Sequence, residues 1–184
     1  MHESAFCVYD FRRAKRSGCV YVRVSCLALR NVNCVIMTDT MIHLYLDNCC
    51  FNRPFDDQSQ LSVRLEAEAV LFIQQTIKEA KVALVWSSIL DFEIRKSPFE
   101  TRREATDEFR KLACFIADVT PEIEQEARRF QSEGLAIIDS LHLACAISAG
   151  CDYFITVDRE ILKNQVPKIA VVNPIQFVHV YEEN

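Results

Sequence analysis

Residues 41–50 have the sequence Met-Ile-His-Leu-Tyr-Leu-Asp-Asn-Cys-Cys, in which a short apolar segment ends abruptly in a carboxylate, Asp47. A carboxylate at the end of a buried strand is costly unless another group or an ion compensates its charge. The apolar segment, residues 42–46, predicts a strand. No helical pattern starts directly after Asp47, so a role as a helix cap does not explain this residue.

The composition is typical of one soluble domain with a sizeable core, because the 184 residues are 50% hydrophobic and 26% charged. No segment approaches the ~18 consecutive apolar residues of a membrane span, and arginines interrupt the segment that could imitate a signal peptide. The nine cysteines are odd in number and follow no zinc-binding spacing. We therefore expect a cytoplasmic protein with reduced thiols and no membrane association.

The composition changes near Met41. The first 40 residues hold six of the 21 basic residues but only three of the 26 acidic ones, so the acidic excess lies in the remainder of the chain. Within the first 40 residues, no helical period or motif supports a second domain. We interpret residues 1–40 as a disordered or loosely docked extension, or as the result of a start upstream of the true initiator, and residues 41–184 as the folded domain.

From Met41 onward, segments typical of strands alternate with segments typical of helices. The strands are expected at residues 42–46, 82–86, 153–157 and 169–172. The helices are expected at residues 61–81, 88–96, 100–117, 121–132 and 138–149, with Gly134 and Gly150 ending the last two. Only two glycines follow Met41, which argues against a glycine-rich phosphate loop. This order predicts an α/β fold, a three-layer α/β/α sandwich around a parallel sheet of four to five strands.

Four carboxylates lie at or just beyond predicted strand ends or open a helix: Asp47, Glu93, Asp139 and Asp158. In parallel sheets, ligands bind beyond the carboxyl ends of the strands, so these four side chains are expected to converge there. Like charges at close range repel unless a cation is present. Mg²⁺ or Mn²⁺ fits this pattern, because both prefer oxygen ligands.

Some of these residues could also have a purely structural explanation. Asp139 and Asp158 could be helix caps. Asp91, three residues after a serine, resembles the acid of a capping box, which leaves Glu93 on another face of the helix without such a role. His142 shares a helix face with Asp139, but a lone histidine in an apolar helix is more often packed, or supports a ligand, than itself a ligand.

Two runs near the C-terminus carry a family resemblance. Residues 139–146, Asp-Ser-Leu-His-Leu-Ala-Cys-Ala, and residues 150–158, Gly-Cys-Asp-Tyr-Phe-Ile-Thr-Val-Asp, resemble the C-terminal signature of the PIN-domain nucleases. The resemblance covers about residues 42–175 and is strongest to bacterial, VapC-like PIN proteins that are ribonuclease toxins of toxin–antitoxin pairs. It implies a compact α/β fold, an acidic cluster that binds Mg²⁺ or Mn²⁺, and endonucleolytic cleavage of RNA.

The resemblance also assigns roles to individual residues. Asp47, Glu93 and Asp139 match the three core acids of the family, Asp158 matches its variable fourth acid, and Thr156 matches a hydroxyl residue two positions earlier. One departure follows the first acid. Many relatives have a small hydroxyl residue and then asparagine, whereas here Asn48 comes directly and Cys49 takes the next place, so the role of Asn48 in orienting water or the first acid stays open.

Cleavage by such a site needs no covalent protein nucleophile, because one or two metal ions activate water and stabilise the leaving oxygen. RNA binding is less apparent, since the folded region is acidic whereas nucleic-acid binders usually present basic surface. The candidate phosphate contacts are Arg53, Arg95, Lys96, Arg102 and Arg103, which could equally be solvated surface charges. Further expected partners are a protein antitoxin that inserts a basic side chain among the acids, and a second copy of the chain.

Two other functions fit the sequence. A non-catalytic PIN module could serve as an RNA-binding or assembly scaffold, although a scaffold does not need four acids. A different Mg²⁺-dependent phosphohydrolase could use a similar sheet, but a dehalogenase-type phosphatase requires a second aspartate where Cys49 stands. The metal-dependent ribonuclease is therefore the favoured interpretation.

Overall fold

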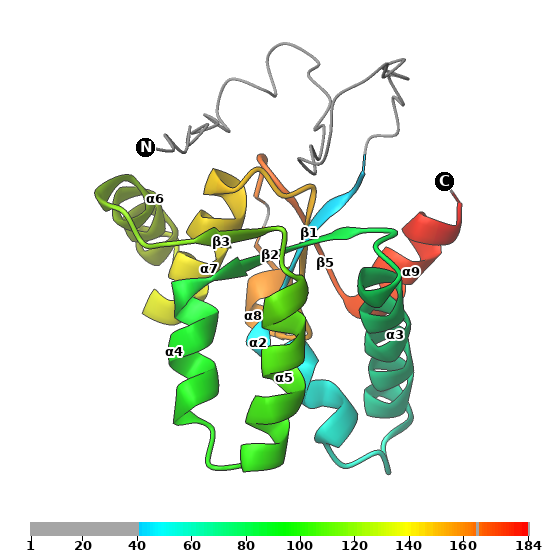
Figure 1. Cartoon of the computed structure of the whole chain (residues 1–184). Helices are drawn as coiled ribbons and strands as arrows, with labels where there is room; N and C mark the ends of the chain where they lie inside the picture. The colour runs from blue at the N-terminus through cyan, green and yellow to red at the C-terminus, as the bar shows by residue number, and fades with distance from the viewer. Residues whose placement is uncertain (1–40, 165, 184) are drawn as a thin grey trace, which may run out of the picture. The chain divides into compact units, whose positions relative to one another are not determined.

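The computed structural model describes residues 41–164 and 166–183, so the proposed extension at residues 1–40 lies outside the described residues. Five strands form one parallel sheet in the order β3-β2-β1-β4-β5 (Figure 1). They are β1 (His43–Leu46), β2 (Ala83–Ser87), β3 (Phe115–Ala117), β4 (Tyr153–Ile155) and β5 (Ala170–Val172). All carboxyl ends therefore lie at the same edge, with β1 in the centre.

Helices lie on both sides of the sheet (Figure 1), which confirms the predicted three-layer α/β/α sandwich. Helix α3 packs against α9, and α6 packs against α7. In chain order, the helices are α2 (Asn48–Asn52), the 3-10 helix η1 (Arg53–Phe55), α3 (Leu61–Lys78), α4 (Ser88–Lys96), α5 (Glu100–Leu112), α6 (Pro121–Ser132), α7 (Ile137–Ser148), α8 (Arg159–Leu162) and α9 (Pro174–Glu182). No helix in the described ranges is both long enough and apolar enough to cross a membrane.

The core is centred on strands β1, β2 and β4, whose apolar side chains are covered on both faces as expected for a parallel sheet. Trp86, Tyr45 and Phe154 are the largest fully buried side chains. The rings of Tyr45 and Phe154 stack with their centroids 5.4 Å apart and their planes 8° from parallel. This packing holds β1 firmly beside β4 and positions the residues that follow both strands.

Several elements differ from the sequence-based expectation, which contained neither η1 nor α8. The helix expected at residues 100–117 ends at Leu112, and Phe115–Ala117 forms the edge strand β3. Only Ala117 of this strand is buried, so the segment lacks the long apolar run of a central strand. A short helix, α2, does begin directly after Asp47, contrary to expectation, because five residues are too few to show a helical period.

Helix α9 was not expected either, although its first turn carries a recognisable signal. Asn173 and Gln176 form a capping box, and Pro174 occupies the first helical position. The expected ends of α6 and α7 are confirmed, because Gly134 and Gly150 follow them with φ values of 103° and 72°.

Candidate metal centre

The carboxyl ends of three adjacent strands bring buried polar side chains to one edge of the sheet. Asp47 follows β1, Ser87 is the last residue of β2, and Thr156 follows β4. Asp47 is 6% exposed, and Ser87 and Thr156 are fully buried. Since β1 pairs with both β2 and β4, the three side chains lie at the centre of this edge.

Asp47 is held by two donors that both contact the same carboxylate oxygen. The Thr156 hydroxyl donates to Oδ2 at 2.7 Å, and the Cys49 thiol donates to Oδ2 at 2.9 Å. Although Asp47 precedes α2, its side chain makes no capping hydrogen bond with that helix. Among the described residues, Oδ1 of Asp47 has no hydrogen-bond donor, which leaves one oxygen free to bind a ligand.

Glu93, in the middle of α4, lies beside Asp47 and His142. One Glu93 carboxylate oxygen, one Asp47 oxygen and one His142 nitrogen all lie within 4.8 Å of one another. His142 Nε2 lies 2.8 Å from Glu93 Oε2. His142 therefore lies within the candidate site, where it contacts Glu93, one of the four acids expected from the sequence.

Asp139 and Asp158 lie outside this group of three, but they belong to the same acidic surroundings. Burial raises the pKa of the Asp139 carboxyl, and the charges of Asp47, Asp158 and Glu93 raise it further, while His142 opposes them. The charges of Asp47, Asp158 and Glu93 all act on Asp139, so these three carboxylates lie in its neighbourhood. The edge of the sheet thus concentrates negative charge from four separate segments.

Of the two possible helix caps, Asp158 and Asp139, only Asp158 caps a helix. Asp158 does cap α8, because its Oδ1 accepts the backbone N–H of Glu160 at 2.7 Å. Its own backbone N–H donates to the Thr156 hydroxyl at 3.0 Å, which ties it to the support of Asp47. Asp139 lies two residues inside α7 and makes no capping bond, so capping does not explain it.

The donor set fits a hard divalent cation. Within the described ranges, none of the four carboxylates forms an ion pair with lysine or arginine, and only Glu93 contacts a histidine. Burying negative charge without a compensating cation is unfavourable. Free carboxylate oxygens next to uncompensated charge are the ligands that Mg²⁺ and Mn²⁺ prefer.

Asp91 has a structural role, as expected, but the predicted capping box with Ser88 is wrong. Ser87, not Ser88, caps α4 by accepting the backbone N–H of Leu90. Asp91 instead accepts a hydrogen bond from the Trp86 indole at 2.8 Å and pairs with the guanidinium of Arg110. It therefore anchors the largest core side chain and takes no part in the acidic cluster.

Asn48 and the candidate RNA contacts differ in how far hydrogen bonds and ion pairs within the protein already occupy their side chains. The Asn52 side chain donates to the Asn48 carbonyl at 3.0 Å and to its side-chain oxygen at 3.3 Å, so Asn48 is tied within α2. The Arg53 side chain is 19% exposed and pairs with Asp56 and Glu66, so its charge is largely used within the protein.

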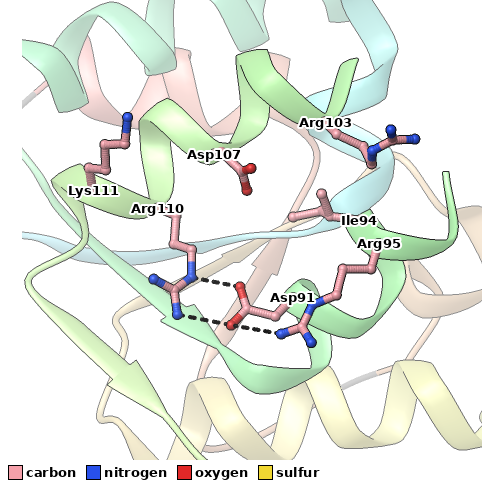
Figure 2. Close-up of a pocket in the computed structure, with 7 residues that line it drawn as sticks. All are labelled: Asp91, Ile94, Arg95, Arg103, Asp107, Arg110 and Lys111. Atoms are coloured by element: carbon pink, nitrogen blue, oxygen red, sulfur yellow. Dashed lines mark hydrogen bonds and ion pairs between the residues drawn. The ribbon is translucent and has the colours of Figure 1, made fainter. Parts of the chain in front are cut away.

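Arg95 and Lys96 are exposed at the end of α4, the helix that carries Glu93. The Arg95 side chain is 79% exposed, with only a 3.9 Å ion pair to Asp91. Figure 2 shows Arg95, Arg103, Arg110 and Lys111 around a surface pocket of about 440 Å³ between α4 and α5. From α4 the pocket is lined by Asp91, Ile94 and Arg95, and Glu93 is not among its lining residues.

Three residues of the site were not identified from the sequence. Tyr45 and Ser87 have the apolar or small character of ordinary strand residues, and their hydroxyls are buried within the core. From the sequence, Cys49 is only a departure from the family pattern. Its thiol donates a hydrogen bond to Asp47 Oδ2, and the only sequence signal was a cysteine two positions after the acid.

The chain is an α/β sandwich with four acids near the carboxyl edge of a parallel sheet, an arrangement whose oxygen ligands fit a divalent cation. A family model described as the PIN domain matches residues 64–166, more than half of the chain. The protein belongs to the PIN-domain family. The matched segment includes Glu93, Asp139 and Asp158, whereas Asp47 precedes it.

Among solved structures, one similar chain comes from the crystal structure of VapBC2 from Rickettsia felis bound to a DNA fragment from their promoter. The similarity has a TM-score of 0.47 and 17% sequence identity, and it covers 72% of this chain and 98% of that one. A comparison with curated proteins finds no significant match.

Proposed function

We propose that this PIN-domain protein is a metal-dependent endoribonuclease whose acids bind Mg²⁺ or Mn²⁺. The observation that carries the proposal is the gathering of Asp47, Glu93, Asp139 and Asp158 at one sheet edge without a lysine or arginine partner among the described residues. A scaffold has no need for such unfavourable charge. A nuclease does, because a divalent cation held there activates water and stabilises charge on a phosphodiester.

The chain's own residues position these ligands. Thr156 and Cys49 fix Oδ2 of Asp47, which directs Oδ1 away from them. His142 holds Oε2 of Glu93 and leaves Oε1 without a donor among the described residues. The supporting hydrogen bonds thus set the orientation of two ligands before any cation arrives, which limits the reorganisation that binding requires.

The proposed substrate contacts begin on α4, the helix that carries Glu93. Arg95 and Lys96 follow Glu93 along α4 and remain largely solvated, as phosphate-binding side chains should be before RNA arrives. Arg103 of α5 lines the same surface pocket as Arg95 and donates to the Ser97 carbonyl at 2.6 Å. Arg102 instead donates to the Phe55 carbonyl at 3.2 Å and lies over the Phe55 and Phe99 rings. We assign no phosphate contact to Arg53, because its two ion pairs occupy it.

The proposal includes a protein antitoxin as partner, on the strength of the sequence resemblance to bacterial PIN toxins. A basic side chain from that partner would compensate the crowded carboxylates and so compete with the cation. A homodimer would place two basic surfaces side by side. Co-expression with the product of an adjacent open reading frame, followed by purification of a complex that does not cleave RNA, tests the antitoxin assignment.

The ribonuclease assignment is tested by incubating the purified full-length chain with a mixed RNA pool in Mn²⁺, Mg²⁺ or EDTA. We expect cleavage in either metal and none in EDTA. The Asp47→Asn variant should lose the activity, whereas Glu104→Gln, which changes an exposed acid on α5, should retain it. No cleavage under any condition by a protein that also binds no metal would support the scaffold instead.

A further inference from the structure

A chain of hydrogen bonds joins Glu93 to the end of strand β2. His142 Nε2 lies 2.8 Å from Glu93 Oε2, and His142 Nδ1 lies 2.6 Å from the Tyr45 hydroxyl. That hydroxyl lies 2.5 Å from the Ser87 hydroxyl, which in turn accepts the backbone N–H of Leu90 at 3.2 Å. Because Leu90 and Glu93 lie on the same helix, α4, the contacts form a closed loop.

Water has little access to these groups. Tyr45 and Ser87 are fully buried, and His142 is 1% exposed. Burial raises the pKa of the Tyr45 hydroxyl well above its usual range, so this group keeps its proton and remains a donor. In such surroundings an unsatisfied polar group is costly, so each hydrogen has to serve one contact.

The groups at the two ends of this series of hydrogen bonds, Glu93 and the Leu90 N–H, determine where its protons lie. A carboxylate oxygen accepts, so the proton between His142 and Glu93 sits on Nε2. The Tyr45 hydroxyl keeps its proton and donates a hydrogen bond to Nδ1, which leaves the Tyr45 oxygen to accept from the Ser87 hydroxyl. The Ser87 oxygen accepts the Leu90 N–H, so every donor in the chain points toward Glu93.

We propose that His142, Tyr45 and Ser87 are positioning residues that hold Glu93 in its metal-binding orientation, and that His142 is not itself a metal ligand. The proximity of His142 to Asp47 and Glu93 would otherwise suggest a ligand. Its Nε2 carries a proton and has no free lone pair, while Nδ1 faces Tyr45. This inference rests on the proposed metal centre and deepens it.

The need for such support follows from the length of the glutamate side chain. Glu93 has three rotatable torsions and projects from a helix, so an unrestrained carboxylate would sample many positions. Asp47 has a shorter side chain and two donors of its own. His142 also lies one turn after Asp139 on α7, so its bond to Glu93 links the two helices that carry acids.

The test measures Mn²⁺ affinity of the full-length protein without RNA, from the electron paramagnetic resonance signal of free hydrated Mn²⁺. His142→Gln places an amide N–H near the position of Nε2 and keeps a donor for Glu93. His142→Asn is one carbon shorter and loses that contact. We expect His142→Asn to weaken Mn²⁺ binding about 10- to 100-fold, as for other residues that orient metal ligands, and His142→Gln to stay within about threefold of wild type.

Tyr45→Phe provides a second test, because it removes only the hydroxyl and keeps the ring stacked on Phe154. It should weaken Mn²⁺ binding by about 3- to 10-fold, the equivalent of one hydrogen bond. Nitrogen chemical shifts of the histidine rings in the wild-type apoprotein should show the Nε2–H tautomer for His142. Circular dichroism and thermal unfolding identify any variant that has not folded.

Each outcome separates the inference from the proposed function. If the wild type binds no Mn²⁺, both are wrong. If the wild type binds Mn²⁺ and His142→Asn binds it equally well, the metal centre stands and the positioning role is overturned. Equal loss in His142→Gln and His142→Asn would instead make His142 a ligand, and an Nδ1–H tautomer would overturn the direction of the chain.

Discussion

The Thr156 hydroxyl is the support of Asp47 that can be removed with the least change in shape. It donates to Asp47 Oδ2 at 2.7 Å and accepts the Asp158 backbone N–H at 3.0 Å, in a fully buried position. Thr156→Val replaces this hydroxyl with a methyl group. The variant should therefore destabilise the metal-free protein although its side chain has almost the same volume.

The magnitude follows from the two hydrogen bonds. A bond to a charged group contributes about 1.5–3 kcal/mol, and the Asp158 N–H left without its acceptor adds about 1 kcal/mol. The added methyl group returns about 0.8 kcal/mol of hydrophobic stabilisation. We therefore expect the free energy of unfolding of Thr156→Val to fall by about 2–3 kcal/mol.

Urea unfolding of the full-length protein in EDTA measures this change. Thr156→Ser is the matched control, because it keeps the hydroxyl and loses one methyl group, at a cost of about 1 kcal/mol. The reasoning is refuted if Thr156→Val unfolds within about 0.5 kcal/mol of wild type. It is also refuted if Thr156→Ser is as unstable as Thr156→Val, since packing would then account for the whole effect.

Three further predictions concern single residues of the site and its surroundings. The raised pKa of Asp139 means that folding favours its protonated form, so the protein loses stability as the pH rises through that pKa. Asp139→Asn should therefore be more stable than wild type at neutral pH, and the difference should disappear below the ordinary aspartate pKa. Thermal unfolding in EDTA measures both. Asp91→Ala leaves the Trp86 indole N–H without its acceptor and should cost about 1–3 kcal/mol in urea unfolding, while RNA cleavage by the folded variant persists. Cys49→Ser keeps a donor for Asp47 and should retain Mn²⁺ affinity within a fewfold, whereas Cys49→Val should reduce it by about tenfold.

Each of these has a result that contradicts it. An Asp139→Asn protein that is less stable than wild type at neutral pH would mean that its carboxylate is favourably compensated in the apoprotein. Loss of cleavage in folded Asp91→Ala would make Asp91 part of the functional site. Equal Mn²⁺ affinity of Cys49→Ser and Cys49→Val would show that the thiol does not orient Asp47.

The sequence predicted the fold where local patterns are strong. The continuous apolar run ending in Trp86 predicted β2, and the apolar periodicity together with its end signals predicted α4 and α6 at their observed bounds. It failed where the pattern is too short, as in the three residues of β3 and the five of α2. These elements depend on pairing or packing with distant parts of the chain, which local periodicity does not report.

The gathering of acids was predictable from topology, because parallel strands end at the same edge. The supporting contacts were not. Tyr45 and His142 are 97 positions apart in the sequence, and a tyrosine inside an apolar strand looks like any core residue. Which of two adjacent serines caps α4 also depended on where β2 ends, and only the structure shows that Ser87 faces both Leu90 and Tyr45.

The most direct test of the central claim is anomalous diffraction from crystals of the full-length protein soaked in Mn²⁺. The account predicts a manganese peak coordinated by oxygens of Asp47 and Glu93, with Asp139 or Asp158 completing the protein ligands, and with His142 still bonded to Glu93. Soaked crystals that show no manganese at this edge of the sheet, or manganese bound to His142 Nε2, would contradict it.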